Sequence, residues 1–351
     1  MTTGGAMAER EWVAPFAVDV RRTLSVQGRG RGDPTFATDE AGAIWRTSLT
    51  PDGPATIRVL PPRASVPQDA PVQTAGETPD ATTRVLAQAW GPGAQWLLDA
   101  LPGALGLYDD ISGFAALVPD AHPVIRDAAR RNPGLRIGRS GRLLEALVPA
   151  ILEQKVVILE AHRAWRILLG KYGTAPPGPA PRGMRVFPPP ATWRRVPSWD
   201  WHRAGVEGVR AETIIRAARV ADSLERLLTL THEEADRRLR TITGIGVWTS
   251  AEARQRAAGD PDAVSVGDYH LKNIVGWALA GKDRSSDEEM LALLEPFKGH
   301  RHRATRLIGL SRAPGITPSR PAGSATGIAR YGVGGPPRRG PRLSVRDYRN
   351  F

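Results

Sequence analysis

The chain has 351 residues, with 48 Lys or Arg against 36 Asp or Glu, so its formal net charge is +12. That field attracts polyanions, and nucleic acid is the commonest polyanion that a basic protein meets, although ribosomal or membrane-surface binding would suit the charge equally well. The sequence contains no cysteine, which excludes disulfides, a thiolate nucleophile, Cys-ligated zinc and Cys-ligated iron–sulfur clusters.

Nothing in the sequence indicates insertion into a membrane. Apolar runs stay well short of the roughly 20 residues of a membrane span, and the first residues, MTTGGAMAEREW, lack the apolar segment of a signal peptide. We therefore expect a cytoplasmic bacterial protein that makes no membrane contact.

Residues 1–130 are predicted to form an N-terminal domain that contains β-strands and connecting helices. Strand-forming residues cluster in FAVDVRRTLSV, AIWRTSL and ATIRVL between positions 16 and 60, and turn-rich segments separate them. This pattern predicts a small antiparallel sheet. Residues 61–80 show no periodicity and are predicted to be a surface connection.

Residues 131–312 are predicted to form a mostly helical core, which gives an α+β fold overall. A long amphipathic segment, RLLEALVPAILEQKVVILEAHRAWRILLGKYG, begins near Gly141 and stops at Gly173, with Pro149 expected to kink it or to stand in its first turn. A proline-rich loop follows. Helices then resume near residue 211 and continue to about residue 311, without any repeat of solenoid type.

Residues 313–351 are rich in Gly, Pro and Arg and have little to bury. We expect this basic tail to be extended or disordered.

The most informative stretch is THEEADRRLRTITGIGVWTSAEARQRAAG, from residue 231 to residue 259. A helical pattern runs into Thr243, Gly244, Ile245 and Gly246, and a second helix starts at once. Glycines on both sides of one aliphatic residue allow a sharp turn that opens backbone amides at a helix N-terminus, where they can bind a phosphate. The alternative is a plain tight turn between two packed helices.

A lone acid follows about twenty residues after this hairpin, in VSVGDYHL. Asp268 lies between an apolar approach and a new helix, LKNIVGWALA. By position alone it would be an N-cap aspartate. Combined with the upstream hairpin, it is a candidate catalytic carboxylate.

Together, LRTITGIGVWT, VGDYHLK and the later PFKGHRHRATRLI resemble the helix-hairpin-helix DNA glycosylase superfamily, specifically its bacterial 3-methyladenine DNA glycosylase II branch. The resemblance spans about residues 133–310, including PGLRIGRSGRLLEALVPAILEQKV. It implies a base-flipping DNA repair enzyme of the nucleoid that acts as a monomer on double-stranded DNA with a damaged base. The expected substrate is an alkylated purine, and no cofactor is required.

The resemblance also assigns roles to individual residues. Asp268 aligns with the catalytic aspartate, and the base pocket would include Trp248, Tyr269 and Gln154. Trp248 stands where bifunctional relatives carry a lysine that forms a Schiff base, which implies hydrolysis by water without lyase activity. Trp248 could equally be a core tryptophan that seals the two helices.

DNA contacts are expected at the hairpin and at two further segments. The predicted contact residues are Thr243, Gly244, Ile245, Gly246, Thr249, Lys155, Lys298, Arg301 and Arg303. The last three come from a basic segment that could also be a solvated helix surface. In this family the hairpin often holds Na⁺ or K⁺, here through the backbone carbonyls of Arg240, Ile242 and Ile245.

Three residues depart from the family pattern. Lys155 replaces the apolar side chain that enters the gap left by the flipped base, and Glu252 and Arg306 stand where aromatic side chains are expected. These departures motivate a second hypothesis, a DNA-binding protein that has lost glycosylase chemistry. A third, an RNA-binding or ribosome-associated protein that relies on the basic tail, does not explain the hairpin.

Overall fold

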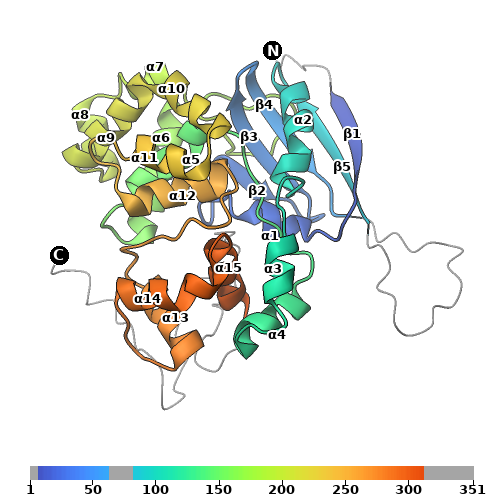
Figure 1. Ribbon diagram of the computed structural model, residues 1–351. Helices are drawn as coiled ribbons and strands as arrows, with labels where there is room; N and C mark the ends of the chain where they lie inside the picture. The colour runs from blue at the N-terminus through green and yellow to red at the C-terminus, as the bar shows by residue number, and fades with distance from the viewer. Residues whose placement is uncertain (1–6, 63–81, 312–351) are drawn as a thin grey trace, which may run out of the picture.

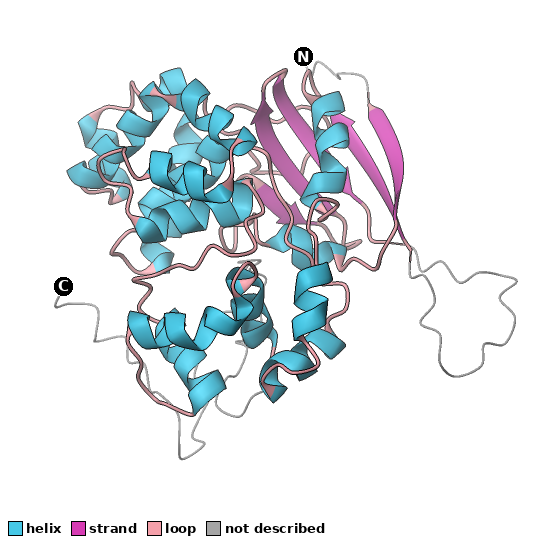
Figure 2. Cartoon of the chain, in the orientation of Figure 1, coloured by secondary structure: helices cyan, strands magenta, loops and turns pink. Residues whose placement is uncertain are grey.

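The computed structural model describes residues 7–62 and 82–311, which form an antiparallel sheet and a set of helices packed beside it (Figures 1 and 2). The five strands lie in the order β1-β5-β4-β3-β2, and all pairings are antiparallel. The strands are β1 (Ala8–Ala14), β2 (Phe36–Thr38), β3 (Ile44–Thr50), β4 (Gly53–Val59) and β5 (Thr83–Trp90). The predicted α+β class is confirmed. The basic tail and most of the predicted connection at 61–80 lie outside the described residues.

The N-terminal region differs from its predicted pattern in one predicted strand and in three strands that were not predicted. Segment FAVDVRRTLSV, predicted as a strand, contains helix α1 (Val20–Ser25), because the Asp19 side chain accepts a hydrogen bond from the backbone N–H of Arg22 and caps the first turn. The prediction omitted three strands, β1, β2 and β5, and β1 pairs with β5 along its whole length.

The remaining helices follow from α2 onward. Their bounds are α2 (Ala94–Ala104), α3 (Ser112–Leu117), α4 (Pro123–Arg131), α5 (Leu143–Leu152), α6 (Ile158–Tyr172), α7 (Pro190–Trp193), α8 (Ser198–Ala204), α9 (Gly208–Arg219), α10 (Ala221–Arg226), α11 (His232–Leu239), α12 (Val247–Ala257), α13 (Leu271–Ala280), α14 (Asp287–Leu294) and α15 (Arg301–Leu310), with short 3₁₀ turns at η1 (Leu227–Thr229) and η2 (Glu295–Phe297). Helices therefore resume before residue 211.

The long segment after Gly141 forms two helices. Pro149 lies within α5, which continues to Leu152, so the proline does not end the helix. The break comes at residues 153–157, where Lys155 adopts φ +52°, the one positive φ among the described non-glycine residues. That conformation turns the chain between the end of α5 and the start of α6.

Three large hydrophobic clusters and a small one of Trp45, Trp90 and Met184 make up the core of the described residues. One lies between the sheet, α1 and α2, and a second is enclosed by α5–α12. The third joins α3 and α4 to α13–α15 through Phe114, Ile125, Val275 and Leu307. Helices α3 and α4, which the predicted boundary at residue 130 places in the N-terminal domain, thus share a core with the C-terminal helices (Figure 1). Within the ranges described, no helix is long and apolar enough to cross a bilayer.

Candidate functional site

The predicted hairpin joins α11 to α12. Helix α11 begins after Thr231, whose hydroxyl accepts a hydrogen bond from the backbone N–H of Glu234 at 3.2 Å. Ile245 is buried in the cluster of α5–α12 and anchors the turn, while Thr243 is exposed. The hairpin therefore presents its backbone on a fixed support.

The two hairpin glycines have different roles. Gly244 has φ +97°, and a Cβ at this position would lie 2.1 Å from the hydroxyl oxygen of Thr213. Gly246 is the N-cap of α12 with φ −96°, an angle open to any residue, and its Cβ would meet no atom within 4 Å. Gly244 is required for the turn itself, whereas Gly246 leaves open space beside the N-terminal amides of α12.

The loop between α5 and α6 is tied to the hairpin. The Gln154 side chain donates hydrogen bonds to the Gly244 carbonyl at 2.8 Å and to the Thr249 hydroxyl at 2.7 Å. Thr249 is buried and its hydroxyl is bonded to Gln154, so its side chain does not face solvent, and the predicted DNA contact at Thr249 stays a prediction. Gln154 positions the loop on the hairpin, and the adjacent Lys155 is exposed beside it.

Asp268 and Trp248 lie together at the start of α12. The Asp268 Oδ1 accepts hydrogen bonds from the backbone N–H groups of His270 and Leu271, each at 2.8 Å, and so caps α13. The Trp248 Nε1 donates toward Asp268 Oδ2 at 3.4 Å. Both side chains are half-buried, and Tyr269 beside them is 38% exposed. The cap orients the carboxylate next to the hairpin helix.

The basic segment before and within α15 is not the cationic surface that was predicted. Arg303 is 2% exposed and forms an ion pair with the buried Asp109, so its predicted phosphate contact is wrong in this structure. Arg301 is bound by both carboxylate oxygens of Asp262. Lys298 remains exposed, with Glu295 at 3.8 Å.

The face of α12 that follows Trp248 is charged and buried. Glu252 and Arg256 lie one and two turns after Trp248 and form an ion pair at 2.7 Å. Ser265, three residues before Asp268, donates a hydrogen bond to Glu252 at 2.5 Å. Burial alone would lower the pKa of Arg256, but the carboxylates of Glu252 and Glu153 outweigh it and raise that pKa.

Sequence analysis identified Glu252 but not its partners. Arg29 forms an ion pair with Glu153 at 3.3 Å, and both are buried beside Arg256. Burial raises the pKa of Glu153 against the opposing effect of Arg29. The i, i+4 spacing along α12 from Trp248 would have indicated Arg256, whereas Arg29 lies more than two hundred residues earlier in the chain.

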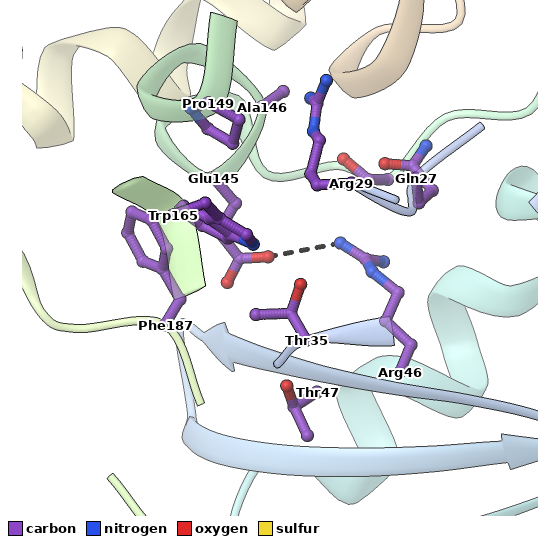
Figure 3. A pocket seen from close by; sticks show the side chains of 11 residues that line it. Gln27, Arg29, Thr35, Arg46, Thr47, Glu145, Ala146, Pro149, Trp165 and Phe187 are labelled. Atoms are coloured by element: carbon purple, nitrogen blue, oxygen red, sulfur yellow. Dashed lines mark hydrogen bonds and ion pairs between the residues drawn. The ribbon is translucent and has the colours of Figure 1, made fainter. Parts of the chain in front are cut away.

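A small polar cavity lies between β3 and α5 (Figure 3). Its volume of about 20 Å³ accommodates roughly one water molecule. Across it Arg46 of β3 pairs with Glu145 of α5 at 3.2 Å, and the Glu145 carboxylate also accepts hydrogen bonds from Ser48 and from the backbone N–H of Leu49. This cavity is a polar joint between the sheet and the helices, too small for a nucleobase.

A cavity of about 460 Å³ lies near the other end of α12, lined in part by Tyr108, Arg139, His232 and Arg254. Helix α12 spans 11 residues, about 16 Å, so this cavity is remote from Trp248. The Asp268 carboxylate is not among the groups that line it.

We compared the chain with protein family models, solved structures and known sequences. No protein family model matches the chain. Among solved structures it resembles a 3-methyladenine DNA-glycosylase from Archaeoglobus fulgidus, with a TM-score of 0.67 and 16% identity over 85% of this chain and 96% of that one. The chain has the fold of the helix-hairpin-helix DNA glycosylases.

Two further comparisons bear on this glycosylase fold. An 8-oxoguanine glycosylase/lyase from Clostridium acetobutylicum gives a TM-score of 0.60 at 14% identity, covering 88% of this chain and all of that one. In sequence, the chain is 25% identical over 203 residues to a DNA-3-methyladenine glycosylase of Bacillus subtilis. The matched residues make up 57% of this chain and 66% of the relative, just under two thirds of its length. Because the fold neighbours act on different bases, the fold alone does not select a substrate.

Proposed function

We propose that this protein is a monofunctional DNA N-glycosylase, which everts a damaged base from double-stranded DNA and hydrolyses its N-glycosidic bond. One observation supports this most strongly: the Asp268 carboxylate lies beside Trp248 at the start of α12, the helix whose N-terminal amides are exposed by the hairpin. Backbone amides that bind a phosphate and a carboxylate that acts on the adjacent sugar must lie close together, as the α12 amides and Asp268 do.

Asp268 would supply the chemistry. Cleavage of an N-glycosidic bond develops positive charge on the sugar, and a carboxylate stabilises that charge and orients the attacking water. Two backbone hydrogen bonds hold Oδ1, which leaves Oδ2 as the oxygen directed toward Trp248. The carboxylate therefore needs little reorientation during the reaction.

Trp248 favours hydrolysis over lyase chemistry. An indole N–H has no free amine with which to form a Schiff base with the sugar, so water is the nucleophile. The ring also offers an electron-rich face to a cationic base. Together with the name of the Bacillus subtilis relative, this makes an alkylated purine the proposed substrate.

A monovalent cation fits the hairpin by the chemistry of its donors. Carbonyl oxygens suit hard cations, and the Ile242 carbonyl, which accepts a hydrogen bond from the Ile245 N–H at 2.9 Å, keeps a second lone pair. We propose that the carbonyls of Arg240, Ile242 and Ile245 hold Na⁺ or K⁺, which would add positive charge beside the bound phosphate.

The decisive experiment is Asp268→Asn measured on methylated duplex DNA. Asparagine keeps an acceptor for the α13 cap, so the fold should be retained, while single-turnover release of methylated base should fall by at least about 100-fold. Thermal unfolding of both proteins controls for folding. Equal release by parent and variant would remove Asp268 from the mechanism.

A second candidate function is DNA binding without catalysis, and the buried Glu252–Arg256 pair favours it. These side chains occupy the α12 face beside Trp248 with charges already satisfied by each other and by Ser265. If the unmodified protein binds duplex DNA with steep salt dependence but releases no base from methylated, deaminated or oxidised duplexes, this second function is correct.

A further inference from the structure

One face of α6 carries two exposed arginines. Leu159, Arg163 and Arg166 are all exposed and are spaced four and three residues apart, so they fall on one stripe of the helix. The opposite side of α6 is buried in the α5–α12 cluster through Ala161, Ala164 and Leu168. The stripe is thus directed away from the core.

Among the described residues no carboxylate forms an ion pair with Arg163 or Arg166, although the exposed Glu160 lies one turn before Arg163. Within residues 7–62 and 82–311, Arg163, Arg166 and Lys155 take part in no salt bridge. By contrast, the exposed arginines of the hairpin's first helix, Arg237 and Arg238, both pair with Glu234. Like charges one helical turn apart disfavour the helix by a few tenths of a kcal/mol when nothing offsets them. An anionic ligand would offset them.

The stripe is continuous with the hairpin at one end and with the N-terminal domain at the other. Helix α6 begins three residues after Lys155, whose neighbour Gln154 bonds the Gly244 carbonyl. At the far end, Arg166 donates a hydrogen bond to the backbone carbonyl of Arg31 at 3.4 Å, and Arg31 is itself exposed. From Ile158 to Arg166 the helix rises about 12 Å, which corresponds to three or four base pairs of duplex.

We infer that the exposed stripe of α6, through Arg163 and Arg166, binds backbone phosphates of the duplex that flanks the hairpin. The inference rests on the proposed function only for the identity of the partner, since it concerns the path of the DNA and not the chemistry. Guanidinium groups bind phosphate in a two-pronged geometry and read no sequence, so the contact serves any flanking sequence.

The test is the salt dependence of duplex binding by the full chain carrying R163A and R166A. Each lost phosphate contact lowers the slope of log K against log salt by about 0.9, so the double variant should lose between about 1 and 2 units of slope. R163K with R166K should retain the slope, because the positive charges remain. Alanine is a good helix former at exposed positions, so both variants should fold, as circular dichroism will check.

The matched control is R130A with R131A at the end of α4. These arginines are also exposed on a helix, although Arg130 pairs with Asp127, their loss changes the net charge by the same two units, and α4 lies far from α6 (Figure 1). This control should keep the parental slope. Equal slopes for the α6 variant and the parent, or an equal loss in the α4 variant, would overturn the inference.

Failure of the proposed function gives a different result. Tight, salt-dependent binding without release of any base would refute the glycosylase and leave the α6 surface intact. Absence of binding to any duplex by the parent protein would refute both.

Discussion

Helices α6 and α15 both contain arginines, yet they use them in opposite ways. In α15, Arg303 is buried and paired with Asp109, and Arg306 is 9% exposed. In α6, Arg163 and Arg166 are exposed and lie opposite the buried face. The number of positive charges in a segment therefore does not locate a phosphate-binding surface. What decides is whether a carboxylate from elsewhere in the fold already satisfies each guanidinium.

The largest effect that separates the two helices is on stability. Arg303→Ala leaves the Asp109 carboxylate buried without its partner, so the free energy of unfolding should fall by about 3–5 kcal/mol. Arg163→Ala removes an exposed side chain and should change that free energy by less than about 0.5 kcal/mol. Urea denaturation of the two variants measures the difference. A change of the same small size in both would mean that the Arg303 pair does not support the fold.

A second, smaller contrast lies within the hairpin. Gly244→Ala forces a side chain into φ +97° and against Thr213, so the unfolding free energy should fall by at least about 1–2 kcal/mol. Gly246→Ala meets open space at an ordinary φ, so it should unfold like the parent within about 0.5 kcal/mol and should weaken duplex binding instead. Denaturation curves and duplex affinities of both variants provide the test. Equal destabilisation would show that the turn needs both glycines for its shape.

These contrasts show what local sequence could predict. The hairpin and Asp268 were predictable because their signals are short: a glycine pair between helical patterns, and an acid before a helix start. The structure brings Trp248, Gln154 and Asp268 around the start of α12. Their roles in binding and catalysis remain proposals.

The errors arise where distant residues decide the outcome. Arg303 is satisfied by Asp109, which lies 194 residues away. The loop that divides the long segment into α5 and α6 is bonded through Gln154 to the hairpin, ninety or more residues later, and sequence pattern does not show that contact. The N-cap of α1 was a local signal at Asp19, and alternation along β1 was another, so those two elements could have been predicted.

The smallest expected effect concerns pH. His302 is buried within α15, and burial, then the charges of Arg306, Arg256 and Arg303, hold its pKa well below the usual value. The folded protein thus keeps this imidazole neutral, while the unfolded chain takes up a proton near pH 6.5. Stability from this group is lost as pH falls below about 6.5, by up to about 1.4 kcal/mol per pH unit.

His302→Gln isolates this contribution, because glutamine is polar and of similar size but does not titrate. The measurement is the slope of the unfolding free energy against pH between 6.5 and 5, obtained by urea denaturation, which does not depend on the variant's stability at pH 7. That slope should be shallower in the variant than in the parent, since carboxyl groups such as Glu153 titrate in both proteins and cancel in the comparison. Parallel slopes would mean that His302 also takes up a proton in the folded protein. The side chains of α15 would then be more accessible to water than their burial indicates.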